Sequence, residues 1–405
     1  MRTLYLCYFG LREPLTQTQV LPYLRELSRS GVATHLLTFE PGWPRSWSDE
    51  ERRAWRERLQ EDGIEWEALA YHKKPSALAT IYDILVGTLV TARLSRREGI
   101  DALHARAHIP LVMALLARRF CGAKIIFDIR GLVADEYVDA GVWRTSGPVY
   151  RTIKWIERTG IARAEQLVVL TERMFAWLVE EMKADPAKIE VIPCCADFSR
   201  FNGKDSGAAA ETGAAGRFEV VYAGSVTGLY LLEEMGRFFL TLRERRPKAY
   251  LRILTASPAA EAAAILSNLG LGEEDYRIGA VPPSEIPAYL IRAKVGLSFR
   301  KPTFSQIAAS PTKVPEYLAA GIPVVSNAGI GDTDRTLLDD RVGIVVRDFS
   351  RESYDEAAGA LLELVDDADL AARCRRSAYE RFDLEKVGAQ RYRRLYQRIQ
   401  HGYTT

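Results

Sequence analysis

Two series of short apolar strands, in which helical segments follow the strands, constrain the fold of this chain more than any other feature. The strands expected in the first series are 3–9, 32–39, 101–104, 124–128, 166–170 and 189–192. The series restarts at 218, with strands expected at 218–223, 250–254, 276–279, 295–299 and 323–326. Strands that alternate with helices predict parallel βαβ units whose sheets are covered on both faces. We therefore expect an α/β protein with two doubly wound, Rossmann-like domains that face each other across a cleft.

The domain boundary is expected where this alternation stops. Residues 202–216 (NGKDSGAAAETGAAG) are rich in Gly and Ala and lack large apolar side chains, as is typical of a linker. The length of 405 residues also exceeds what one hydrophobic core usually supports, about 250–300 residues. We expect a first domain at 1–201, a linker at 202–217, a second domain at 218–385 and a terminal helix at 386–405.

Charge and cysteine content narrow the class of protein. Lys and Arg (55) nearly balance Asp and Glu (53), which disfavours a protein that binds nucleic acid through phosphate contacts. The five cysteines show no CxxC or other zinc-like spacing, and the first ten residues already follow a strand pattern. No charge-free apolar run reaches 18 residues, so a membrane-spanning helix is not expected. These features predict a soluble cytoplasmic protein that has no nucleic-acid partner.

The segment Ser310–Val325 (SPTKVPEYLAAGIPVV) carries the clearest chemical signal. If Thr312 caps a helix, Lys313 is its first residue and Pro315 falls in the first turn, where amides have no intrahelical partner. The free amides, the helix dipole and the Lys313 ammonium then form an anion site. Glu316 lies on the same helix face, and suits a phosphate site only if ribose hydroxyls donate to it. The alternative is a surface ion pair between Lys313 and Glu316 on an ordinary helix.

This segment resembles the donor-binding helix of the retaining GT-B glycosyltransferases of family 4. Further segments are similar to family segments in the same order, namely Asp101–Pro110 (DALHARAHIP), Phe127–Gly131 (FDIRG), Val191–Phe201 (VIPCCADFSRF), Tyr222–Ser225 (YAGS) and Phe382–Tyr396. The resemblance covers nearly all of the chain and implies the GT-B architecture. It also implies that the first domain holds the acceptor, that the second holds the nucleotide sugar, and that the terminal helix crosses back to the first domain.

The chain departs from the family pattern at three places. Ala308 stands where the family has the first Glu of its E-x7-E pair, whose second member is Glu316. Leu15–Gln19 replaces the Gly-Gly loop of the first domain, and Val226–Gly228 follows Ser225 where the family has an Arg…Lys pair. The diphosphate charge must then be met by other cations and amides. The donor-binding residues expected on this basis are Gly224, Ser225, Arg300, Lys301, Ser310, Thr312, Lys313 and Glu316.

Candidates for the sugar and the acceptor come from the first domain. His104, Arg106 and His108 alternate at the expected end of a strand and start of a helix, and in the family a histidine of this region touches the donor sugar. We expect the catalytic contact from these three residues, with a hydrogen-bonded structural histidine as the alternative. Asp128 and Arg130 end the next strand and are expected to contact the acceptor, or else to form a local ion pair.

The resulting hypothesis is a retaining glycosyltransferase. It would move a sugar from a nucleoside-diphosphate sugar to an acceptor, for which a lipid-linked glycan of surface polysaccharide assembly is one candidate. No cofactor and no metal are expected, because no DxD-type cluster stands at an expected strand end and cations can neutralise the leaving diphosphate. The alternatives are a GT-B-like nucleotide-binding subunit without transfer activity, and a sugar-nucleotide epimerase or phosphorylase of the same fold.

An apolar stripe marks a further helix. Its members are Leu78, Ile81, Tyr82, Leu85, Val86 and Leu89, at helical spacing. Lys73, Lys74, Arg93, Arg96 and Arg97 flank the stripe. Two interpretations stay open: a helix packed in the core with solvated ends, or peripheral docking of 73–97 on an anionic membrane, which would place the protein at the inner face of the membrane.

Overall fold

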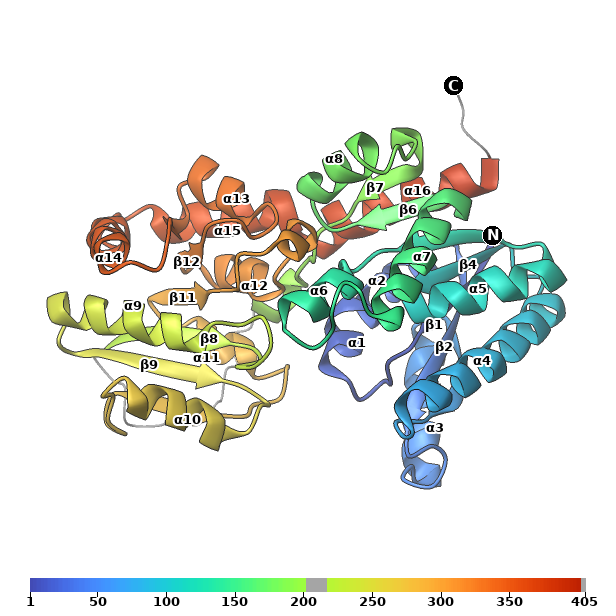
Figure 1. Ribbon diagram of the computed structural model, residues 1–405, viewed down its shortest axis with the longest axis horizontal. Coiled ribbons are helices and arrows are strands. Elements are labelled where there is room, and N and C mark those ends of the chain that lie inside the picture. Colours follow the sequence, from blue (N-terminus) through green and yellow to red (C-terminus); the bar gives the residue numbers. More distant parts are fainter. Residues whose placement is uncertain (202–216, 402–405) are drawn as a thin grey trace. The chain divides into compact units, whose positions relative to one another are not determined.

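The described part of the chain, residues 1–201 and 217–401 of a computed structural model, forms two compact units (Figure 1). The first unit contains 1–138, 143–193 and 384–401, and the second contains 139–142, 194–201 and 217–383. The expected linker, 202–217, lies outside the described residues except for Arg217.

The boundary between the units lies earlier than the expected position after residue 201. Ala196 pairs with Asp383 in an isolated parallel bridge, and Arg200 forms an ion pair with Glu316. Phe198 and Phe201 pack against the apolar core of the second unit. Residues 194–201 therefore belong to the second unit, because their side chains are held by it.

The first unit is built on a seven-stranded parallel sheet in the order β3-β2-β1-β4-β5-β6-β7. Its strands are β1 (Arg2–Cys7), β2 (Ala33–Pro41), β3 (Ile64–Tyr71), β4 (Ala102–Arg106), β5 (Lys124–Asp128), β6 (Gln166–Val169) and β7 (Ile189–Val191). Its helices are α1 (Pro14–Gln19), α2 (Leu21–Arg29), α3 (Asp49–Glu61), α4 (Ser76–Glu98), α5 (His108–Cys121), α6 (Val133–Asp139), α7 (Pro148–Arg163), α8 (Glu172–Glu180) and α16 (Gln390–His401). The central strand β4 is buried at every position because helices cover both faces of the sheet.

The second unit repeats this architecture with a six-stranded parallel sheet in the order β10-β9-β8-β11-β12-β13. Its strands are β8 (Phe218–Ala223), β9 (Ala249–Leu254), β10 (Tyr276–Gly279), β11 (Val295–Ser298), β12 (Val324–Asn327) and β13 (Gly343–Val346). Its helices are α9 (Leu232–Arg245), α10 (Ala259–Asn268), α11 (Ile286–Leu290), α12 (Lys313–Ala320), α13 (Thr333–Asp339), α14 (Arg351–Val365) and α15 (Leu370–Phe382). Two apolar clusters form its core. The expected fold class of two doubly wound α/β domains is therefore confirmed.

Helix α16 is the element of the first unit that comes from farthest along the sequence. Its buried residues Tyr392, Leu395, Tyr396 and Ile399 recur at helical spacing and form one face. Lys124 Nζ donates to the Ile399 carbonyl, and Tyr396 Oη lies 3.1 Å from Thr3 Oγ1. Figure 1 shows this red helix among the blue and green elements of the first unit.

Both sheets have a switch point, where consecutive crossovers change direction. It lies between β1 and β4 in the first unit and between β8 and β11 in the second. In open α/β sheets ligands bind beside such points, outside the carboxyl ends of the strands. Ligand sites are therefore expected at the loops after β1 and β4 in the first unit and after β8 and β11 in the second.

Candidate donor-binding site

Lys313 lies at the switch point of the second sheet. It is the first residue of α12, and its side chain is only 4% exposed. Its Nζ lies 4.4 Å from the ring centroid of Tyr230 and 5.1 Å from that of Tyr222. Among the described residues it has no carboxylate within ion-pair distance. Burial lowers the pKa of Lys313, because an enclosed ammonium lacks the solvation that favours its charged form.

Gly224, directly after β8, leaves room for this ammonium. Its φ of 146° is one that L residues rarely adopt, and a Cβ there would lie 3.2 Å from both Cε and Nζ of Lys313. The next residue, Ser225, lies in a hydroxyl cluster, since its Oγ is 3.2 Å from Thr227 Oγ1 and 3.4 Å from Ser257 Oγ. A cluster of hydroxyl groups thus follows Gly224, the residue that lies against the Lys313 side chain.

Arg300 brings a second cation to the same aromatic ring. Its guanidinium carbon lies 4.7 Å from the ring centroid of Tyr230, and its Nε donates to Gln306 Oε1 at 2.6 Å. The Arg300 backbone amide donates to Asn327 Oδ1 at 2.8 Å. Two cations beside one ring, at the carboxyl ends of β8 and β11, can bind a diphosphate and stabilise charge that develops on it.

Tyr230 is one of the residues of this site that the sequence did not predict. An isolated antiparallel bridge pairs it with Arg300, and the Lys301 amide donates to the Leu229 carbonyl at 2.8 Å. The loop after β8 is thereby fixed beside the segment after β11, which sets the ring between the two cations. No spacing in the sequence indicates this role, because the bridge joins residues 70 positions apart.

Glu316 is placed beside the anion site but already has a partner. Arg200 Nη1 donates to Glu316 Oε1 at 3.0 Å, and Arg200 Nη2 donates to the Pro283 carbonyl. Burial raises the pKa of Glu316, which the adjacent Arg200 guanidinium opposes. An acceptor for ribose hydroxyls remains available if the carboxylate keeps one oxygen for the ligand. Arg200 was part of a quoted family segment but was not expected at the site.

Three further expected donor residues have different local roles. The Thr312 side chain does not cap α12: the residue has helical dihedral angles, and a Val314-to-Pro311 backbone bond closes the first turn instead. Ser310 Oγ accepts from the Cys194 amide at 3.1 Å. Lys301 is exposed, and its Nζ donates to the Asp139 carbonyl at 2.6 Å. The structure therefore brings together Gly224, Arg300 and Lys313, with Ser225 and Glu316 beside them.

In the first unit, His104 lies in a buried polar network. The side chain is fully buried, its Nδ1 bonds to Tyr396 Oη at 2.8 Å, and its Nε2 lies 3.7 Å from Asp128 Oδ2. Burial lowers the pKa of His104, because a charged ring would lose its solvation there, and the nearby Asp128 opposes this shift. For His104 the structure supports the alternative of a hydrogen-bonded structural histidine, because Tyr396 on α16 is its partner. Its contact with the donor sugar stays a prediction.

Asp128 belongs to the same buried network. It is fully buried at the end of β5, where Tyr5 and Tyr392 hydroxyls donate to it. Burial would raise the pKa of Asp128, but Arg130, the neighbouring His104 ring and Arg106 hold it below its usual range. This enclosure supports the alternative of a local ion pair at the strand end, and contact with the acceptor stays a prediction.

The junction of β4 and α5 keeps the other expected residues near the strand end. Arg106 is 5% exposed, with Nη1 3.6 Å from Asp128 Oδ2, and Arg130 Nη1 lies 3.5 Å from Asp128 Oδ1. His108 Nε2 lies 3.4 Å from Glu157 Oε2, while its buried Nδ1 has no hydrogen-bond partner among the described residues. Ala107, between Arg106 and His108 in the chain, has φ 67° and ψ −172°, a conformation almost restricted to glycine. Such strain is common at functional sites.

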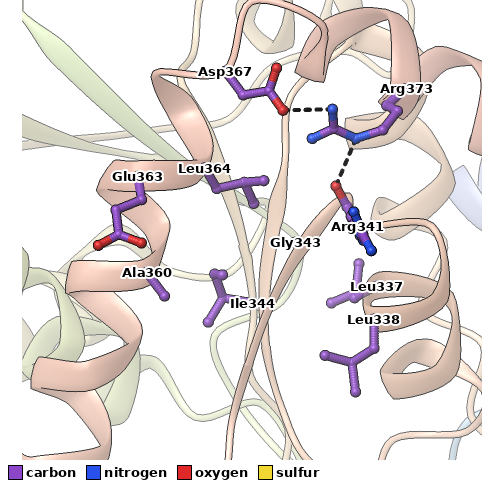
Figure 2. A pocket seen from close by; sticks show the side chains of 10 residues that line it. All are labelled: Leu337, Leu338, Arg341, Gly343, Ile344, Ala360, Glu363, Leu364, Asp367 and Arg373. Atoms are coloured by element: carbon purple, nitrogen blue, oxygen red, sulfur yellow. Dashed lines mark hydrogen bonds and ion pairs between the residues drawn. The ribbon is translucent and has the colours of Figure 1, made fainter.

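A groove of about 450 Å³ lies elsewhere in the second unit (Figure 2). Leu337, Ile344 and Leu364 contribute apolar walls, and Arg373 donates to Asp367 and to the Arg341 carbonyl. Its residues come from the start of β13 and the ends of α13 and α14, at the sheet edge opposite to Lys313. It is therefore separate from the donor residues. Among the described residues, no group of three or more His, Cys, Asp or Glu could hold a metal ion.

Comparison with known proteins identifies the family. Residues 16–195 match the model of the glycosyl transferase 4-like domain, and residues 237–397 match that of a glycosyl transferase-like domain. The D-inositol 3-phosphate glycosyltransferase of Nocardia farcinica is 29% identical over 289 residues, which are 67% of this chain and 62% of that protein. The chain thus aligns with less than two thirds of the length of this curated relative.

Solved structures share the fold. A glycosyltransferase from Rickettsia africae superimposes with a TM-score of 0.71 at 14% identity, covering 99% of both chains. Anabaena HepE in complex with UDP and glucose superimposes with a TM-score of 0.70 at 14% identity, covering 98% of this chain and 99% of that one. The two domain models match in tandem across most of the chain. Its two parallel-sheet α/β domains are those of the GT-B fold. The chain therefore belongs to the GT-B glycosyltransferases of family 4, group 1.

Proposed function

We propose that the protein transfers a sugar from a nucleoside-diphosphate sugar to an acceptor, with retention at the anomeric carbon. The observation that carries this proposal is the pair of cations, Lys313 and Arg300, beside Tyr230 at the switch point of the second sheet. Neither cation is neutralised by a carboxylate among the described residues, so both charges are available to a ligand. A diphosphate fits this demand, and Glu316 three residues along α12 suits the adjoining ribose.

The chemistry needs stabilisation of a leaving group more than a protein nucleophile. As the bond to the anomeric carbon breaks, negative charge grows on the diphosphate, and a buried ammonium and a fixed guanidinium stabilise that charge. Because cations of the chain supply this role, we propose that transfer is independent of a metal. The family resemblance assigns the leaving phosphate oxygen as the base for the acceptor hydroxyl, which gives retention without a covalent glycosyl intermediate.

Arg106 and His108 are the first-unit residues that we propose for the donor sugar. They flank the strained Ala107 at the switch point of their sheet, and His108 Nδ1 is a buried donor or acceptor that lacks a protein partner in the described part of the chain. Arg130, which is 12% exposed, is proposed to contact the acceptor. Asp128 is proposed to orient Arg106 and Arg130, whose guanidinium groups lie 3.6 Å and 3.5 Å from its oxygens, while His104 packs beside it.

A lipid-linked glycan in surface polysaccharide assembly is the acceptor class that we propose, with the protein at the cytoplasmic face of the membrane. Support comes from α4 in the first unit, whose large apolar side chains are exposed. A carrier lipid keeps its sugar at the bilayer surface, so an enzyme that uses it gains from an apolar face on its acceptor unit.

A nucleotide panel tests the proposal. Calorimetry with UDP, GDP and ADP, beginning with UDP, should show one tight binder, and its sugar derivatives should then be hydrolysed slowly without acceptor. The anomeric configuration of the first product, read by proton NMR, should match that of the donor. Chelation of divalent metals should leave the rate unchanged. Inversion, or complete loss of turnover on chelation, would contradict the mechanism.

The ion pair between Arg200 and Glu316 supports one alternative, a nucleotide-binding subunit without transfer activity. In that case Glu316 stays paired with Arg200. Ala308 replaces the first Glu of the family pair because a subunit that only binds nucleotide does not need that carboxylate for catalysis. Tight nucleotide binding without hydrolysis or transfer of any donor sugar would favour this subunit.

A further inference from the structure

Helix α4 in the first unit has the reverse of the usual amphipathic arrangement. Its exposed side carries large apolar residues, Leu78 (68% exposed), Ile81 (53%), Tyr82 (56%), Leu85 (55%) and Leu89 (70%). These five side chains, here called the α4 face, follow helical spacing over three turns. Its buried side carries mostly small or polar residues instead, with one leucine: Ala79, Asp83, Gly87, Thr88, Thr91, Ala92, Leu94 and Ser95. A helix in contact with water alone would show the opposite distribution.

Contacts on the buried side fix this orientation. Asp83 accepts from Tyr8 Oη at 2.7 Å and lies 2.6 Å from His72 Nδ1, so the helix cannot rotate without losing a buried carboxylate's partners. Gly87 approaches Met113 and Phe39 so closely that a Cβ would lie 2.7 Å from Met113 Sδ. The α4 face is therefore held outward by its own unit.

The neighbouring helix α5 extends the apolar surface. Leu116 is 38% and Phe120 55% exposed, and they lie one turn apart. Arg96 Nε on α4 donates to the Phe120 carbonyl at 2.7 Å, which joins the cationic end of α4 to this extension. Figure 1 shows α4 and α5 side by side in the first unit. Seven exposed large apolar side chains on two neighbouring helices indicate an interaction site.

The charges around the α4 face are of one sign. Exposed cations stand before and after it, Lys73, Lys74, Arg93, Arg96 and Arg97 on or beside α4 and Arg119 on α5. The acidic residues of α4 are Asp83, which is buried, and Glu98, which pairs with Arg97, and α5 has none. A second copy of the chain would set like charges against each other across a two-fold axis. An anionic surface complements them.

We propose that the α4 face docks the first unit onto an anionic lipid bilayer, with α4 lying in the plane of the interface. Leucine, isoleucine and tyrosine side chains enter the boundary between head groups and acyl chains, while the flanking cations meet lipid phosphates. By length and composition α4 could also cross a membrane. The Asp83 contacts and the packing of Gly87 keep it within the fold, so it lies on the bilayer rather than across it. The docking rests on the same exposed α4 side chains as the proposed lipid-linked acceptor, but its test uses neither donor nor acceptor, so the two proposals can fail separately.

Vesicle co-sedimentation of the full chain tests this docking. Wild type should pellet with phosphatidylcholine vesicles that contain phosphatidylglycerol, and binding should fall with added salt and without the anionic lipid. The Leu85→Gln/Leu89→Gln variant should bind weaker by on the order of tenfold per leucine. The Lys73→Ser/Lys74→Ser variant should bind weaker by about fivefold per charge at low salt. The matched control, Leu338→Gln/Arg335→Gln, changes an exposed leucine and an exposed arginine on α13 and should bind like wild type.

Three results would overturn the proposal. The first is wild type that stays in the supernatant with anionic vesicles at low salt. The second is a dimer, detected by light scattering, that Leu85→Gln/Leu89→Gln dissociates, because the face would then be an interface between copies. The third is bound protein that resists extraction by high salt and alkaline carbonate, which would indicate a spanning helix. Thermal melting of each variant shows that changed binding does not come from unfolding.

Discussion

Replacing Lys313 by methionine should separate nucleotide binding from stability. The substitution keeps an unbranched side chain of similar length and removes the charge. Nζ lies 4.4 Å from the ring centroid of Tyr230 and 5.1 Å from that of Tyr222. A phosphate charge about 4 Å from Nζ would be stabilised by up to about 4 kcal/mol at an effective dielectric constant of about 20. Part of this gain offsets desolvation of the phosphate, so we expect kcat/KM at low donor concentration to fall by about 10²–10³.

Stability should respond in the opposite direction. The ammonium is nearly buried without a carboxylate partner in the described part of the chain, and methionine replaces its contacts with Tyr222 and Tyr230 by sulfur–aromatic ones. We expect the free energy of unfolding to stay unchanged or to rise by up to about 2 kcal/mol. Lys294→Met, at an exposed position before β11, is the matched control and should change neither property.

The pH dependence of this stability difference follows from the lowered pKa of Lys313. Between the folded-state and unfolded-state pKa values, the unfolded chain binds more protons, so the wild type gains stability as pH rises through that interval. The melting-temperature advantage of Lys313→Met should therefore shrink toward alkaline pH. Unchanged nucleotide affinity in calorimetry, or a variant markedly less stable than wild type at neutral pH, would refute this account of the site.

Five further substitutions, at four positions, test other parts of the two units. Glu316→Gln should weaken ribonucleotide binding by on the order of tenfold and reduce selectivity over deoxyribonucleotides; wild-type selectivity would show that Glu316 serves only Arg200. Tyr230→Leu should raise donor KM more than it lowers kcat, while Tyr230→Phe, which keeps the ring, should preserve KM; equal effects would remove the ring from cation positioning. Ala107→Gly should raise unfolding free energy by about 0.5–2 kcal/mol by relieving strain, and a lower melting temperature would contradict that strain. Tyr396→Phe should cost about 1–3 kcal/mol, since it leaves buried His104 Nδ1 without its partner; an unchanged melting curve would count against the network.

The strand–helix alternation was sufficient to predict two doubly wound domains, but not the strands β3 and β13, which lie at the edges of their sheets. The central strands are continuous apolar runs because both faces are buried, and such runs are visible in sequence. Strand β3 lies at the sheet edge, and its two glutamates, Glu65 and Glu67, alternate with buried Ile64 and Trp66. Its signal is an alternation of period two, which a search for apolar runs overlooks.

Side-chain positions were predictable where they depend on one helix and its local sequence. Lys313 at the start of α12 is such a case, and its role in donor binding stays a prediction. His104 is not, because its cover comes from Tyr396, which lies 292 positions away. The stripe from Leu78 to Leu89 shows the same limit, since periodicity reveals that an apolar face exists but not whether it turns inward. The opposite side of the helix turns inward because Gly87 there allows close packing on Met113 and Phe39.

The return of residues 384–401 to the first unit has a consequence for synthesis of the chain. The first unit lacks α16 until the 190 residues of 194–383 have been translated, which takes about 10–40 s at about 5–20 residues per second. During that interval the polar side chains that Tyr396 covers, among them His104 and Thr3, are exposed to water or to chaperones. The first unit is thus expected to reach its final packing only after the second unit has been translated.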